Sequence, residues 1–124
     1  MSQEVHNRMA QFAFSSIQTI GNTNREFRSL ARSMPSMIQV NGLGAGVAFL
    51  CAKKKRANAH ERMYKLLNEW LKERGYLKPG KQADLMESIV NLDSSTYRLY
   101  TNECMNLCLW VKRFAEGMIE NEVE

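Results

Sequence analysis

Residues 93–119 read DSSTYRLYTNECMNLCLWVKRFAEGMI. Seven residues in this stretch recur in alternating steps of four and three, which is the spacing of one face of a long helix. They are Tyr97, Thr101, Cys104, Cys108, Val111, Ala115 and Met118. A second stripe beside them comprises Tyr100, Leu107, Trp110 and Phe114. Because the two stripes cover about half of the helix circumference, we expect either two neighbouring helices to pack on them or one stripe to face a partner.

The rest of the chain has the same helical periodicity, and no segment alternates at the period of two that a β-strand requires. Besides the final helix, which ends at about residue 119, the expected helices span residues 3–20, 24–33, 47–52, 59–74 and 82–92, with a short one at 35–40. The sequence therefore predicts an all-α fold, a compact helical bundle of about five to six helices with a long C-terminal helix.

Three segments carry specific local expectations. Pro35 cannot continue a helical hydrogen-bond ladder, so it is predicted to end the second helix and to begin the short one. Residues 47–52 are apolar on every side and are predicted to form the buried central helix, preceded by three glycines that favour close packing. The helix at residues 82–92 is expected to bury four apolar side chains: Leu85, Met86, Ile89 and Val90.

The length of 124 residues is typical of one domain. We expect a single domain over residues 1–124, with a short acidic tail at about 119–124. The first residues lack the basic start and apolar run of a signal peptide, and the longest uncharged stretch is broken by a proline and glycines. Three cysteines without a disulfide-framework spacing indicate a reducing compartment, so a cytoplasmic protein without membrane contact is expected.

The charge is distributed unevenly along the chain. Up to Lys81 there are 14 Lys and Arg against 5 Asp and Glu, which gives +9. From Gln82 onward there are 3 against 8, which gives −5. A basic body favours a polyanionic partner, and the acidic C-terminal segment is expected to repel or guide that partner.

Two clusters of basic residues favour phosphate binding. The first is a stripe at helical spacing with no acidic residue in it: Arg25, Arg28 and Arg32. The second is a continuous run after the predicted central helix: Lys53, Lys54, Lys55 and Arg56. A merely solvated helix face usually mixes both signs of charge. Arginine can also bind a phosphate through two parallel hydrogen bonds, so both clusters are predicted to contact phosphates.

Motifs for catalysis or metal binding each fail at a chemically required residue. His60-Glu61 begins like a zinc-protease motif, but Tyr64 stands where a second histidine is needed. Residues 75–82 have the spacing of a phosphate-binding loop, but Gln82 replaces the Ser or Thr that would hold magnesium. We therefore predict no catalytic residue, metal, cofactor or small-molecule substrate. A helical ribonuclease that uses Arg56 and His60 remains an alternative.

Short landmarks follow one another in order over most of the chain. They are Pro35, Asn41-Gly42-Leu43, Ala48-Phe49-Leu50, Lys53, Tyr64, Leu67, Trp70-Leu71, Tyr97-Arg98, Thr101 and residues 110–116. No single landmark is specific. The ordered set resembles the small helical subunit of type III-B CRISPR RNA-targeting complexes, the Cmr complexes.

The resemblance implies a non-catalytic subunit that stacks in several copies as a minor filament and contacts the backbone and large subunits of the Cmr complex. It also implies that basic residues contact the guide RNA and target RNA without reading base sequence. Lys53 and Arg113 lie within matching landmarks, whereas the other basic residues above rest on the charge pattern alone. Phe14, Tyr100 and Trp110 are the predicted contacts with partner proteins. An adaptor that binds only proteins is the second alternative.

Overall fold

The structure is a computed structural model, and it describes residues 2–77 and 84–120. Within these residues the chain forms six helices and no strand. They are α1 (Gln3–Ile20), α2 (Arg25–Asn41), α3 (Leu43–Lys53), α4 (Ala59–Glu73), α5 (Leu85–Ile89) and α6 (Ser94–Met118). The predicted all-α fold with a long C-terminal helix is confirmed.

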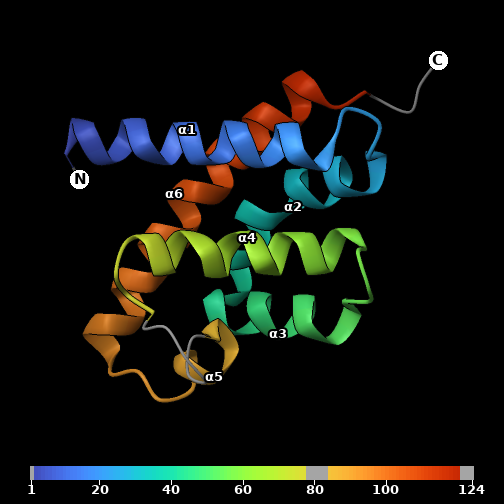
Figure 1. Cartoon of the computed structure of the whole chain (residues 1–124). Helices are drawn as coiled ribbons and strands as arrows, with labels where there is room; N and C mark the ends of the chain where they lie inside the picture. The colour runs from blue at the N-terminus through green and yellow to red at the C-terminus, as the bar shows by residue number, and fades with distance from the viewer. Residues whose placement is uncertain (1, 78–83, 121–124) are drawn as a thin grey trace.

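The helices are arranged in two crossing layers (Figure 1). α1, α4 and α3 lie one below the other, and α2 and α6 pass behind them. Because α2 and α6 run in roughly opposite directions, the start of α2 and the end of α6 lie together, at the upper right of the view.

The long helix α6 has the two neighbours that its wide apolar surface predicts. It begins where the Asp93 carboxylate accepts a hydrogen bond from the Thr96 backbone N–H at 2.8 Å. Both α1 and α2 pack on it along its length. Cys104, Cys108 and Val111, in the middle of the predicted stripe, are fully buried. The stripes therefore serve mainly the core of this chain.

α2 continues through Pro35, so the predicted break at this residue is wrong. A proline inside a helix removes one hydrogen bond and costs about 3 kcal/mol or more. Four large side chains on both sides of it are buried: Phe27, Leu30, Met34 and Ile38. Since each such burial contributes roughly 1.5–3 kcal/mol, the packing of one uninterrupted helix outweighs the cost of the proline.

Gly42 joins α2 to α3 in a backbone conformation that only glycine adopts readily, with φ 92° and ψ 160°. Two residues later, the Gly44 backbone N–H donates a hydrogen bond to the Tyr97 hydroxyl at 2.8 Å. A Cβ on Gly44 would lie 3.3 Å from that hydroxyl. The predicted packing role of the glycines is thus confirmed at Gly44, where the start of α3 lies close against α6.

Gly42→Ala is expected to lower the free energy of unfolding by about 1–3 kcal/mol, because an L side chain is strained in this conformation. Gly117→Ala is the matched control, since Gly117 lies within α6 and a Cβ there would meet no atom within 4 Å. The control should be neutral or stabilising by up to about 1 kcal/mol. Urea unfolding of both variants measures the difference, and equal midpoints would contradict the strained backbone.

α3 is neither central nor buried on every side, so the prediction for residues 47–52 is wrong in both respects. The helix begins earlier, at Leu43, and lies at the lower edge of the molecule beside α4 (Figure 1). Its buried residues are Leu43, Gly46, Val47 and Leu50, while Ala45, Ala48 and Ala52 are exposed. Alanine has little surface to remove from water, so an exposed face made of it costs little.

α4 and α5 agree with the sequence to different degrees. α4 ends as predicted at Gly75, which has φ 83° and donates its N–H to the Lys72 carbonyl at 2.9 Å. α5 is shorter than predicted. The sequence pattern Lys-Pro-Gly-Lys predicts a turn at residues 78–81; this turn and residues 82–83 of the predicted helix lie outside the described residues. Leu85 and Ile89 are buried, but Met86 and Val90 are exposed, contrary to expectation. A helix of one turn directs only one edge toward the core.

Glu103 of α6 is the one buried charged residue in the described part of the chain, with 4% of its surface exposed. It accepts hydrogen bonds from the Trp70 indole N–H at 3.1 Å and from the Arg74 Nε at 3.1 Å. Arg74 also donates to the Tyr76 hydroxyl at 3.0 Å. The hydrogen bond to Glu103 raises the pKa of Arg74 above its usual value. This network fastens the end of α4 to the middle of α6.

Candidate nucleic-acid interface

The α2 arginine stripe (Arg25, Arg28 and Arg32) lies against the C-terminal end of α6. The Arg25 Nη2 is 3.9 Å from a carboxylate oxygen of Glu120. The Arg32 Nε is 3.4 Å from a carboxylate oxygen of Glu116. Between them, the Arg28 Nη2 donates to the Glu116 backbone carbonyl at 3.4 Å. All three arginines therefore have a partner on the last turns of the chain.

The stripe itself contains no acidic residue, as predicted, but the expectation that its arginines are unpaired is wrong. The carboxylates come from α6 and the residues just after it, far along the chain; Arg28 and Glu116 are 88 residues apart. Both ion pairs remain open to water. The side chains of Arg25 and Glu120 are 52% and 57% exposed. Those of Arg32 and Glu116 are 62% and 36% exposed. Exposed pairs of this kind contribute only about 0–1 kcal/mol, so another anion can replace the carboxylates at small cost.

The basic loop (Lys53, Lys54, Lys55 and Arg56) joins the end of α3 to the start of α4, and all four residues are exposed. None of the four forms an ion pair within residues 2–77 and 84–120. The Lys54 ammonium lies 4.5 Å from the centre of the Tyr64 ring, a cation–π contact that adds no negative charge to the loop. Four neighbouring cations thus face solvent without a carboxylate partner.

The shape of this loop is set by the start of α4. The Asn58 side chain accepts a hydrogen bond from the Glu61 N–H at 2.8 Å and donates one to the Lys53 carbonyl at 3.0 Å. The Glu61 carboxylate accepts from the Ala57 N–H at 2.6 Å, and Ala57 has φ 62°. Because these hydrogen bonds use local backbone groups, they hold the loop in one shape without engaging the four basic side chains.

Phe14, predicted to contact a partner, lies in an aromatic patch (Phe14, Trp110 and Phe114) between α1 and α6. Phe14 is 42% exposed and packs edge-on against Phe114, with ring centres 5.6 Å apart. Phe114 stacks on Trp110 at 5.5 Å, and the Arg113 guanidinium lies 5.8 Å from the Trp110 ring. The patch therefore combines aromatic surface with one exposed cation.

Tyr100, the third predicted partner contact, is 5% exposed. Its hydroxyl donates a hydrogen bond to the Tyr76 carbonyl at 2.7 Å. Burial in the fold leaves this side chain almost no surface for a partner, so Tyr100 forms part of the core rather than of the aromatic patch.

Arg56 and His60 are not arranged as the ribonuclease alternative requires. That alternative assumed one helical turn between them, but Arg56 lies in the basic loop and α4 begins only at Ala59. The His60 ring packs against Phe49 with ring centres 5.4 Å apart, and its Nδ1 is buried without a hydrogen-bond partner among the described groups. A general base needs a proton-accepting nitrogen within reach of substrate. The buried Nδ1 does not meet this requirement.

The cysteines are poor nucleophiles. Burial raises the pKa of Cys108 to about 12, and burial likewise raises the pKa of Cys104 well above its usual value. The pKa of the half-buried Cys51 is also raised, chiefly by burial. Since the thiolate is the reactive form, all three remain thiols at neutral pH. They pack as small apolar residues, which is the usual role of cysteines outside disulfides.

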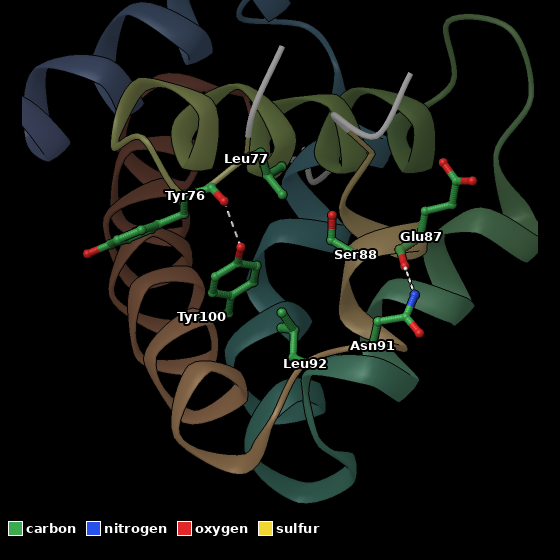
Figure 2. Close-up of a pocket in the computed structure, with 7 residues that line it drawn as sticks. All are labelled: Tyr76, Leu77, Glu87, Ser88, Asn91, Leu92 and Tyr100. Carbon is green, nitrogen blue, oxygen red and sulfur yellow. Dashed lines mark hydrogen bonds between the residues drawn. The ribbon is translucent and has the colours of Figure 1, made fainter. Parts of the chain in front are cut away.

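One pocket of about 390 Å³ lies where the segment after α4, α5 and α6 meet (Figure 2). Its lining residues are Tyr76, Leu77, Glu87, Ser88, Asn91, Leu92 and Tyr100. The Glu87 carboxylate and the Tyr76 hydroxyl point away from the other lining residues. A ligand site needs polar groups that converge, and these two do not.

Neither a cluster of metal ligands nor a membrane-spanning helix is found in the described part of the chain. In residues 2–77 and 84–120, no three His, Cys, Asp or Glu side chains lie together as metal ligands. Of the helices in these two ranges, none has the length and apolar character needed to cross a membrane.

The chain matches a known protein family over most of its length. The sequence model of the family described as "CRISPR-associated protein (Cas_Cmr5)" matches residues 5–118. The chain belongs to the Cmr5 family. The fold agrees with the crystal structure of a CRISPR-associated Cmr5 family protein from Thermus thermophilus, with a TM-score of 0.75 and 24% identity. The match covers 97% of this chain and 100% of that one.

Membership of the Cmr5 family makes this chain a small subunit of a type III-B CRISPR Cmr complex. The resemblance inferred from the ordered landmarks is thereby confirmed. In this Cmr5 family member, the basic loop and the α2 arginine stripe are the two cationic surfaces that sequence reasoning singled out.

Sequence reasoning missed the two carboxylates that face the stripe, Glu116 and Glu120. The only signal for them was the negative charge of the C-terminal part of the chain. That signal gives the sign of the charge of the segment, but it does not show which face of which helix the carboxylates contact.

Proposed function

We propose that this Cmr5 family member is a non-catalytic subunit that contacts the guide RNA and target RNA through phosphates, without reading base sequence. Several copies would stack as a minor filament and contact the backbone and large subunits of the complex. Cleavage would then belong to other subunits. The proposal combines family membership with the charge of the described surface.

The observation that carries the proposal is the basic loop. Its four cations are exposed, adjacent and without carboxylate partners within the described residues. An array of this kind repels itself unless an anion neutralises it, and an RNA backbone supplies phosphates at a matching density. Ammonium and guanidinium groups bind phosphate oxygens whatever the base, which is why no sequence preference is expected.

Stacking of several copies would raise the affinity for RNA. One copy offers only a few phosphate contacts, so its own affinity for RNA should be weak. When copies are held in a row, RNA bound to one copy lies close to the next, so each further contact forms within the same complex. Avidity would then raise the overall affinity for RNA without any new kind of contact.

The exposed Phe14 and the half-buried Trp110 of the aromatic patch favour a further role in contacting neighbouring subunits. Aromatic side chains are enriched in protein interfaces because they combine large apolar area with rigidity. Under this proposal the patch serves protein partners and the basic loop serves RNA.

Replacing the four residues of the basic loop with alanine is expected to weaken binding of a labelled oligouridylate by tenfold or more. The plot of log affinity against log salt should also flatten by about 0.7 for each phosphate that the variant no longer neutralises. Fluorescence anisotropy of the purified full chain across a range of NaCl concentrations measures both effects.

A control with the same loss of charge comes from scattered exposed positions: Arg8, Lys65, Lys72 and Arg98. Alanine at these four sites should change RNA affinity much less, although the net charge falls equally. If the two quadruple variants weaken binding to the same degree, net charge rather than the basic loop governs binding, and the proposed site is wrong.

A further inference from the structure

We propose that the end of α6 competes with RNA for the α2 arginine stripe, with the carboxylates of Glu116 and Glu120 occupying places that RNA phosphates take on binding. The inference rests on the proposed function, since it assigns a regulation to one of the two RNA-contacting surfaces. RNA would therefore bind first at the basic loop and reach the stripe only by displacing the carboxylates.

Each carboxylate forms a long ion pair with one guanidinium group of the stripe. Glu120 lies 3.9 Å from Arg25, and Glu116 lies 3.4 Å from Arg32. Carboxylate and phosphate oxygens use the same guanidinium N–H donors, so one anion must leave before the other can bind.

The competing carboxylates are held in place by the backbone that carries them. Ile119 is buried, although the sequence placed it in an acidic tail. The Glu120 N–H donates a hydrogen bond to the Asn22 carbonyl at 2.7 Å, which ties the segment just after α6 to the turn before α2. An anion fixed this way is always present at high effective concentration, so it competes with RNA even in dilute protein.

The occupation is incomplete, which makes it reversible. Two carboxylates and one carbonyl serve three guanidinium groups, each with five N–H donors. The Nε of Arg28 is buried and has no hydrogen-bond partner in the described part of the chain. That buried atom is out of reach of solvent, whereas the side chains of Arg25 and Arg32 are 52% and 62% exposed. An incoming phosphate can therefore bind their remaining N–H donors and replace the two carboxylates stepwise.

The test is the double variant Glu116→Gln/Glu120→Gln in the full chain, which keeps side-chain size and removes both charges. It should bind a fluorescein-labelled 20-nucleotide oligouridylate about three- to tenfold more tightly than the original chain at low salt. The salt dependence should steepen by about 0.7 for each arginine freed. Circular dichroism melting checks that both proteins fold equally.

Two controls decide the outcome. Glu73→Gln/Glu87→Gln changes the net charge by the same amount at exposed carboxylates that form no ion pair within residues 2–77 and 84–120. An equal gain in this variant overturns the inference. Adding Arg25→Ala/Arg32→Ala to the Glu116→Gln/Glu120→Gln chain should abolish the gain, and a retained gain also overturns it.

Failure of the inference can be told apart from failure of the proposed function. If RNA binding depends on the basic loop but Glu116→Gln/Glu120→Gln gives no gain, only the competition is wrong. If neither the original chain nor the double variant binds the oligouridylate at low salt, both are wrong.

Discussion

Glu103→Ala should lower the free energy of unfolding by about 3–5 kcal/mol, because removing one partner of a buried ion pair leaves the other uncompensated. Arg74, whose side chain is 20% exposed, would lose its carboxylate. The fully buried Trp70 would also lose the acceptor for its indole N–H. For a chain of this size the melting temperature should fall by roughly 10–20 °C. Thermal and urea unfolding followed by circular dichroism measure the loss.

Glu103→Gln is the control that separates charge from shape. Glutamine keeps the volume and still offers an oxygen to the Trp70 indole, so it should destabilise the fold less than alanine does. If Glu103→Ala costs under about 1 kcal/mol, the network contributes little, and the attachment of α4 to α6 must rest on apolar packing alone.

Trp70→Ala should destabilise the fold by about 3–5 kcal/mol through loss of core packing. Trp70 is fully buried in α4, and its ring lies 5.3 Å from that of Phe12 of α1. The substitution therefore opens a cavity between two helices and also removes the hydrogen bond to Glu103. Chemical unfolding measures the loss.

Trp70→Phe divides this loss into its two parts. Phenylalanine keeps much of the ring but has no N–H to donate. The free energy of unfolding of Trp70→Phe should therefore lie between that of the original chain and that of Trp70→Ala. Because the Trp70 indole N–H donates to the Glu103 carboxylate, the effects of Trp70→Phe and Glu103→Ala should not add. Strict additivity in the double variant would show that the two side chains are not coupled.

The parts of the fold that follow a local rule could be predicted. α1 and α6 have uninterrupted apolar periodicity and clear caps, and α4 ends at a glycine with positive φ. The failures at Pro35 and α3 share one cause. In both places tertiary packing outweighed a local preference, and the neighbours that supply this packing cannot be seen from the local sequence.

The candidate site was predictable to a similar extent. The basic loop depends on four consecutive residues and lies exposed as expected. The arginine stripe was found from helical spacing. Whether its arginines are paired depends on Glu116 and Glu120, which come close only because α2 and α6 cross. Tyr100 and Trp110 share one stripe of α6, yet one is buried and the other is half-buried. The arrangement of the surrounding helices decides such cases, and periodicity along one helix cannot.

The packing of α6 on both α1 and α2 has a consequence for how the chain is made. α1 and α2 leave the ribosome before α6, and the parts of their inner faces that pack on α6 stay exposed until that helix has been synthesised. Contacts between such distant segments slow folding because a long loop must close before they form. The newborn protein is therefore most exposed to aggregation during the time in which its last helix is translated.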